Sequence, residues 1–154
     1  MKRLRHRDSA IDGVDVRLLR ALESNGRLPH AELARLVGMS APSVAERLRR
    51  LEDTGVIRRY TVEIDPASIG YPITAHIRIQ PMPGQVKKIA ALLAELPEIV
   101  ECDRITGDDC FVARAHVRSV AHLERLIYRI APNGRTNTAI VQSSPVPRRL
   151  PPTP

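Results

Sequence analysis

The hydrophobic residues of this chain change their spacing partway along it, and this change constrains the fold more than any other feature. Up to about residue 55 they recur every three or four residues, as on one face of an α-helix. From about residue 73, segments that alternate apolar and polar residues are interleaved with helical ones. We therefore expect an α+β protein, with a helical domain followed by a mixed one.

Three helices are predicted in the first part of the chain. Asp12 is suited to cap a helix over about residues 13–24, because its side chain can accept hydrogen bonds from the first backbone N–H groups. A short second helix ends at Gly38, and Ser40 caps a third helix that Gly55 ends. Because so little chain separates the second and third helices, the turn between them is very short.

The third helix sorts its residues onto two faces. Val44, Leu48 and Leu51 form an apolar stripe, and the opposite face carries Ser43, Glu46, Arg47 and Arg50. This arrangement is typical of a helix-turn-helix, whose last helix lies in the DNA major groove. A generic three-helix bundle with a solvated charged face fits the periodicity as well. The candidate DNA-binding residues are Ser40, Ser43, Arg47, Arg50, Arg58 and Arg59.

Residues 56–65 are rich in β-forming residues, and Pro66, Gly70 and Pro72 then break the pattern. Half of the last ten residues are proline, so that tail is expected to be extended and to have no place in a core. The predicted division is a basic N-terminal arm (residues 1–10), a helix-turn-helix domain of the winged type (11–64), a hinge (65–72), a βαββαβ domain (73–146) and a Pro-rich tail (147–154).

The second domain is predicted to be ferredoxin-like, because its segments follow the order βαββαβ. Gly107, Asp108 and Asp109 form a tight turn between its second and third strands. The two helices should cover one face of the sheet, which leaves the other face for dimerisation. The predicted strands cover about residues 74–81, 100–106, 110–117 and 136–143, and the helices centre on residues 86–93 and 123–130.

The charge balance favours an acidic partner. The 154 residues include 24 Lys and Arg against 17 Asp and Glu, a formal net charge of +7, and most of the cations are Arg. Arginine suits bidentate contacts with phosphates and guanine edges. With no Trp, one Phe and three Tyr, the chain has few aromatic residues on which single-stranded bases could stack. Duplex DNA is therefore the favoured nucleic acid.

Other classes of protein find little support in the sequence. No apolar run is long enough to span a membrane and no secretion signal follows the basic N-terminus, so we expect a cytoplasmic protein without a membrane partner. No hydrolase, zinc-protease or nucleotide-binding motif occurs. A metal site could be assembled from Cys102, Cys110, His76, His116 and His122, but no pair has the usual zinc spacing. We expect no metal or cofactor, and expect both cysteines to pack as small hydrophobic residues in the strand hairpin.

Several stretches, taken in order, resemble the Lrp/AsnC (leucine-responsive, feast/famine) family of transcriptional regulators. They are IDGVDVRLLRAL, NGRLPHAELARLVGMS, SVAERLRRLEDTGVIRRYTVEIDPASIG, TGDDC and TNTAIVQS, between about Ile11 and Arg149. The resemblance implies an N-terminal helix-turn-helix for DNA. It also implies a C-terminal βαββαβ domain that dimerises, assembles higher oligomers and often binds an amino acid between subunits.

Two positions depart from the pattern of that family. Pro29 stands where a serine usually caps the second helix, so that helix loses a side-chain cap. Cys110 replaces the last carboxylate of the usual Gly-x-x-Asp. Asp108 and Asp109 are most simply turn residues, but the resemblance implies an effector loop in which they accept from an amino acid's ammonium. The candidate effector residues are Thr106, Gly107, Asp108, Asp109, Cys110, Thr136 and Thr138.

The leading hypothesis is a sequence-specific DNA-binding transcriptional regulator that responds to an amino acid or a related metabolite. Two alternatives remain open. The sirohaem decarboxylases resemble these regulators in both domains, and His76, His116 and His122 would then serve a tetrapyrrole. The third possibility is a metabolite-binding assembly protein without DNA activity.

Overall fold

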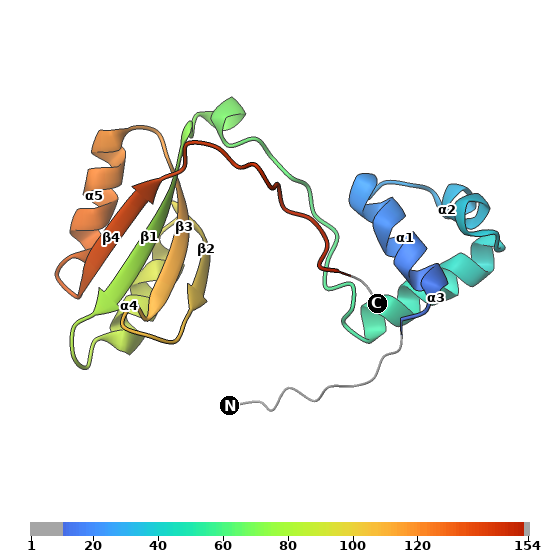
Figure 1. Cartoon of the computed structure of the whole chain (residues 1–154), viewed down its shortest axis with the longest axis horizontal. Helices are drawn as coiled ribbons and strands as arrows, with labels where there is room; N and C mark the ends of the chain where they lie inside the picture. Colours follow the sequence, from blue (N-terminus) through green and yellow to red (C-terminus); the bar gives the residue numbers. More distant parts are fainter. Residues whose placement is uncertain (1–10, 153–154) are drawn as a thin grey trace. The chain divides into compact units, whose positions relative to one another are not determined.

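The computed structural model describes residues 11–152 and shows two compact units (Figure 1). The first unit includes the chain up to Val62 together with the segment from Val146, and the second is Glu63–Pro145. The predicted basic arm, residues 1–10, lies outside the described residues, as do the last two residues of the tail. Within residues 11–152 no helix is both long and apolar enough to cross a membrane.

Three helices form the first unit, as predicted: α1 (Gly13–Ser24), α2 (His30–Val37) and α3 (Ala41–Asp53). Gly38 follows α2 with a φ of 72°, a left-handed conformation that glycine adopts without steric cost, and the chain turns there into α3. The apolar faces of the helices meet in one core, formed by Leu18, Leu33, Ala34, Val37, Val44, Leu48 and Leu51.

The helix caps follow the sequence closely. Asp12 accepts from the backbone N–H groups of Val14 and Asp15, as predicted, and the Asp15 side chain accepts from the Asp12 N–H, which completes a capping box. Ser40 caps α3 by accepting from the Ser43 N–H. Pro29 precedes α2 and makes no side-chain hydrogen bond, as expected. These caps place the start of each helix to within a residue.

Residues 56–65 form no strand in the described chain, so the prediction of a β-rich wing is wrong for the isolated protomer. The segment is extended, but no second segment of the chain hydrogen-bonds along it, and a strand needs such a partner. Its apolar side chains at Tyr60, Val62 and Ile64 are consequently exposed. A short 3₁₀ helix, Ala67–Ile69, follows.

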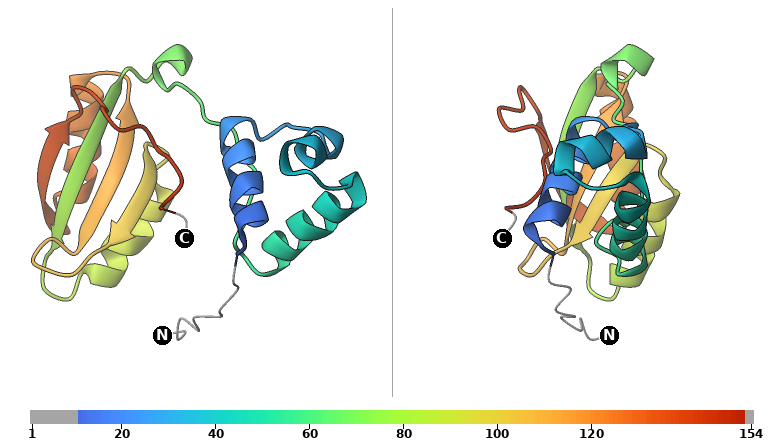
Figure 2. Two further views of the ribbon diagram at one scale, coloured as in Figure 1. Left: turned by 45° about the vertical axis from the view of Figure 1, so that its right-hand side comes forward. Right: turned by 90° about the vertical axis from the view of Figure 1, so that its right-hand side faces the viewer.

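The second unit has the predicted ferredoxin-like topology. In chain order its elements are β1 (Ile73–Pro81), α4 (Val86–Glu95), β2 (Ile99–Arg104), β3 (Phe111–Val117), α5 (Val120–Ile130) and β4 (Gly134–Ile140). The strands form one antiparallel sheet in the order β2-β3-β1-β4, with a register shift in β2 between Ile99 and Glu101. Both helices cover the same face of this sheet (Figures 1 and 2).

Alternation along the strands separates a core face from an open face. Ala75, Ile77 and Ile79 of β1 are fully buried under α4 and α5, together with alternate residues of β3. Residues between them in sequence, such as His76 and Arg78, lie on the face that no described helix covers. The sheet therefore keeps one face available to a partner.

The connection between β2 and β3 is longer than the predicted three-residue turn. The Ile105 N–H donates to the Cys110 carbonyl at 2.9 Å, and this bond closes a loop of Thr106–Asp109. Gly107 has a φ of 108°, which only glycine adopts readily. Cys110 is partly buried against the core, but Cys102 is exposed, contrary to the prediction, because β2 is an edge strand.

Candidate nucleic-acid interface and effector loop

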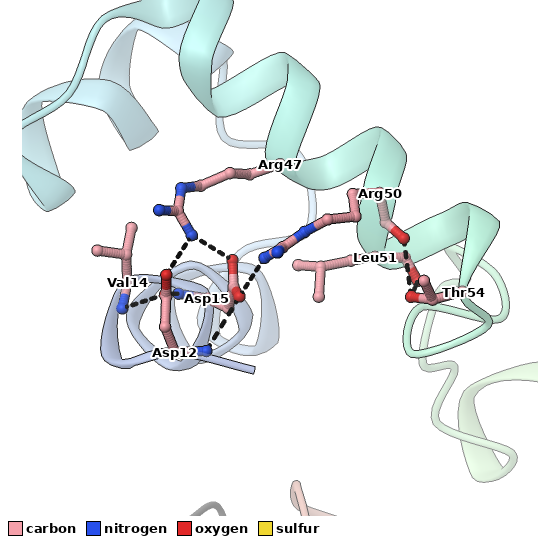
Figure 3. A network of polar contacts seen from close by, with 7 residues as sticks. All are labelled: Asp12, Val14, Asp15, Arg47, Arg50, Leu51 and Thr54. Carbon is pink, nitrogen blue, oxygen red and sulfur yellow. Dashed lines mark hydrogen bonds and ion pairs between the residues drawn. The ribbon is translucent and has the colours of Figure 1, made fainter. Parts of the chain in front are cut away.

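The side of α3 next to α1 carries an ion-pair network (Figure 3). Asp15 of α1 is fully buried, and its carboxylate accepts from Arg47 Nη1 at 2.9 Å and from Arg50 Nη2 at 2.5 Å. Arg47 Nη1 also donates to Asp12 Oδ2 at 2.7 Å. The same two carboxylates form the capping box of α1, so the network ties the start of α1 to the middle of α3.

The network shifts the ionisation of its members. Hydrogen bonds from the Asp15 backbone N–H and from the Arg47 guanidinium lower the pKa of Asp12 to about 2. The carboxylates of Asp12 and Asp15, in that order of importance, raise the pKa of Arg47. These contacts favour the charged forms of Asp12 and Arg47.

Arg47 and Arg50 were both expected on the exposed face of α3, and the structure shows Arg50 exposed but Arg47 only partly so. Their contact with DNA stays a prediction. The Arg47 side chain is only 25% exposed and is held by two carboxylates. Arg50 is 49% exposed, but its guanidinium is engaged by the buried Asp15. Releasing either arginine would leave the buried Asp15 carboxylate with one charged partner fewer, a cost that the partial exposure of both arginines reduces.

The outer side of α3 carries a different pair, Glu46 and Arg49. Arg49 Nη2 donates to Glu46 Oε1 at 2.9 Å, and the two side chains are 67% and 68% exposed. This hydrogen bond is also the main reason that the pKa of Glu46 is lowered. Sequence analysis placed Glu46 on the polar face but did not select either residue as a DNA contact. The signal was available, since both stand opposite Val44 and Leu48 on the helical wheel.

The remaining candidate DNA-binding residues lie near the two ends of α3. The hydroxyl oxygens of Ser40 and Ser43 are 2.8 Å apart at its start, beside an open groove lined by Met39, Pro42, Ser43, Glu46, Arg47 and Arg50. Arg58 and Arg59 follow the helix, are exposed and make no hydrogen bond or ion pair with residues 11–152. These two cations are available to phosphates.

The predicted effector residues separate into a loop and a strand. Thr106, Gly107 and Asp108 are exposed in the β2–β3 loop. In the same loop, Asp109 Oδ2 lies 3.8 Å from Nη1 of Arg78 on β1. Thr136 and Thr138 lie on β4, opposite Ile79 and Ile77 of β1, and so point to the helix-covered face.

The Thr138 hydroxyl is buried and has no hydrogen-bond partner. The assignment of Thr138 to the effector site stays a prediction.

The three histidines proposed for a tetrapyrrole have separate surroundings. At the start of α5, His122 Nε2 lies 3.0 Å from Glu98 Oε1. His116 Nδ1 lies 3.0 Å from the Thr74 hydroxyl oxygen. Burial, followed by the charge of Arg114, lowers the pKa of His116. His76 is exposed on the open sheet face. Among the described residues no group of three or more His, Cys, Asp or Glu is placed to hold a metal ion.

Comparison with known proteins identifies both units. The AsnC-type helix-turn-helix domain matches residues 11–52, and the Lrp/AsnC ligand binding domain matches residues 74–151. The HTH-type transcriptional regulator YezC of Bacillus subtilis, itself uncharacterised, is 39% identical over 134 residues, which are 87% of this chain and 95% of that protein.

Two solved structures extend the likeness to the whole fold. The structure of LrpC from B. subtilis has a TM-score of 0.86 and 29% identity, covering 90% of this chain and 99% of that one. A feast or famine regulatory protein from Mycobacterium tuberculosis, complexed with L-methionine, has a TM-score of 0.84 and 33% identity, covering 92% and 98%. This chain therefore belongs to the Lrp/AsnC family of transcriptional regulators.

Proposed function

We propose that this protein is a sequence-specific regulator that binds duplex DNA through α3 and responds to an amino acid. The observation that carries the proposal is the exposed polar surface of α3, capped by Ser40 and supported by a core shared with α1 and α2. A helix held in this way can enter the major groove with its first turns against the bases. Arg58 and Arg59, exposed after α3, supply phosphate contacts that position the helix.

The DNA-bound form is proposed to be a homodimer, assembled into higher oligomers through the second unit. The open face of the sheet supports this, because α4 and α5 cover only the other face. This open face carries both signs of charge, with Glu101 paired in register with Arg114, and an apolar Val112 beside them. A second copy related by a twofold axis could therefore meet it with complementary charges.

The effector is proposed to bind at the β2–β3 loop, completed by a neighbouring subunit. Asp108 and Asp109 supply carboxylates for an ammonium group, and the backbone near Gly107 can approach a ligand closely because it has no side chain. The methionine-bound relative from M. tuberculosis supports an amino acid as the ligand class. Thr136 lies at the same end of the sheet as this loop, since Ile79 pairs with both Phe111 and Thr136.

Catalysis is not part of the proposal, because the relatives are named as regulators and no specific contact favours a tetrapyrrole. The deciding experiment selects duplexes bound by the full-length protein from a random pool, and repeats the selection with each of the twenty amino acids. We expect enrichment of an inverted repeat, with half-sites about one helical turn or a multiple apart. Failure to enrich any sequence would refute the regulator assignment. Enrichment that no amino acid changes would refute only its effector part.

A further inference from the structure

The four charged residues in the middle of α3 differ in their partners: Arg47 and Arg50 bind Asp15 of α1, whereas Glu46 and Arg49 bind each other. Glu46 lines the same groove as Arg47 and Arg50. Arg47 and Arg50 turn toward α1, where Asp15 holds both guanidinium groups (Figure 3). Glu46 and Arg49 turn away from the core and hydrogen-bond to each other. The two pairs therefore differ in what must be broken before either could contact a base.

The inner arginines cannot leave without exposing a defect in the core. The Asp15 carboxylate is fully buried and receives three donors, the Asp12 N–H at 3.1 Å and the two arginines. If Arg47 moved to a base, the buried carboxylate would lose a charge-assisted bond and keep only Arg50 and one backbone N–H as donors. The gain at the base would be offset by this loss.

The outer pair is free to exchange partners. Both side chains are about two-thirds exposed, so water already solvates them and screens their attraction. Three contacts join them, at 2.9, 3.2 and 3.3 Å, and all lie between long, flexible side chains on consecutive turns. Opening this pair leaves no buried group unsatisfied.

Each outer side chain has a matching base edge in the major groove. A guanidinium donates bidentately to O6 and N7 of guanine, and a carboxylate accepts from the N4 amino group of cytosine. We propose that Glu46 and Arg49 are the charged base-reading residues of α3, with Glu46 on cytosine and Arg49 on guanine, and that Arg47 and Arg50 are positioning residues. This inference rests on the proposed function, since it names the readers within that same interface.

The exchange of partners also provides discrimination. On a sequence that lacks the matching bases, the pair either stays closed and reads no base, or opens and leaves the Glu46 carboxylate without a donor in the negative potential of the groove. On the matching sequence both groups are satisfied by bases. Specificity then comes from rejection of wrong sites as well as from attraction to the right one.

The test is selection from a random duplex pool by the full-length wild type and by single variants. Glu46→Gln should move the preferred base from cytosine toward adenine at one position of each half-site, since glutamine pairs with adenine. Arg49→Ala should lose the guanine preference, by roughly 5- to 150-fold against the other bases. Glu32 and Arg35 form an exposed pair of the same spacing on α2, so Glu32→Gln and Arg35→Ala are matched controls that should leave every base preference unchanged.

The positioning role has its own readout. Arg47→Lys should keep the wild-type base preferences but weaken binding to all DNA sequences alike. It should also lower the thermal midpoint of the first unit. Unchanged preferences in both Glu46→Gln and Arg49→Ala would overturn the inference, as would a new base preference in Arg47→Lys at an unchanged thermal midpoint. A wild type that enriches no sequence would instead refute the proposed function, which separates the two failures.

Discussion

Replacing Arg47 by alanine tests whether α3 is held by its contacts with α1. The substitution removes donors at 2.7 and 2.9 Å from Asp12 and Asp15, and leaves the buried Asp15 with Arg50 and one backbone N–H. Breaking a buried ion pair costs about 3–5 kcal/mol. Because Arg50 remains and water can reach part of the site, we expect about 2–3 kcal/mol in the free energy of unfolding.

A loss of this size should be large in a unit of three short helices. One kcal/mol shifts the thermal midpoint of a small domain by about 4–8 °C, so the first unit should melt about 10–20 °C earlier. Circular dichroism of the full chain would follow the helices, and hydrogen exchange of peptides from α1 and α3 would assign the transition to the first unit. Peptides from β1 and β3 should keep their protection.

Arg49→Ala is the matched control, because Arg49 lies on the same helix but pairs with Glu46 instead of Asp15, and its pair is exposed. Its midpoint should stay within experimental scatter of the wild type. Equal melting of Arg47→Ala and Arg49→Ala would refute the reasoning, since the buried carboxylate would then not depend on its arginine. A destabilised second unit in Arg47→Ala would refute it as well.

Three further outcomes are expected. The pKa of Asp12 is lowered from 3.8 to about 2 in the folded protein, so its contribution to stability is present above pH 3.8 and is lost as the pH falls toward 2. Asp12→Asn keeps a cap but cannot titrate, so the free energy of unfolding of this variant should change less with pH in that interval than that of the wild type. Gly107→Trp should abolish amino-acid binding measured by calorimetry, and binding that survives it would place the effector elsewhere. Val112→Glu, on the open sheet face, should shift sedimentation from dimer toward monomer, whereas an unchanged dimer would place the interface elsewhere.

Local signals predicted the helices well because each boundary has its own chemistry. Asp12 and Ser40 cap α1 and α3 through hydrogen bonds to residues two or three positions away, and Gly38 supplies the left-handed turn. Such contacts join residues only a few positions apart, so a short stretch of sequence is enough to predict them. The βαββαβ order was likewise recoverable, because each strand and helix shows its own periodicity.

The features that sequence analysis missed depend on residues distant in the chain. A helical wheel places Arg47 at the edge of the apolar stripe, three residues after Val44, but it cannot show that α1 brings Asp15 within 2.9 Å of it across 32 positions. The two oxygens of Asp15 serve the capping box and the arginines together, and only the capping contact joins residues close in sequence. Cys102 was misplaced for a similar reason, since hairpin pairing does not reveal which strand lies at the sheet edge.

The register shift in β2 affects how copies of the protein behave when they are crowded. An edge strand offers unpaired backbone groups to any strand that approaches, and a regular apolar edge invites fibre-like growth. Here the edge strand is only six residues long, is irregular between Ile99 and Glu101, and carries charges at Glu101, Asp103 and Arg104. These features make β2 a poor template for a further strand. A protein concentrated along DNA is thereby protected at this edge from growing into a continuous sheet.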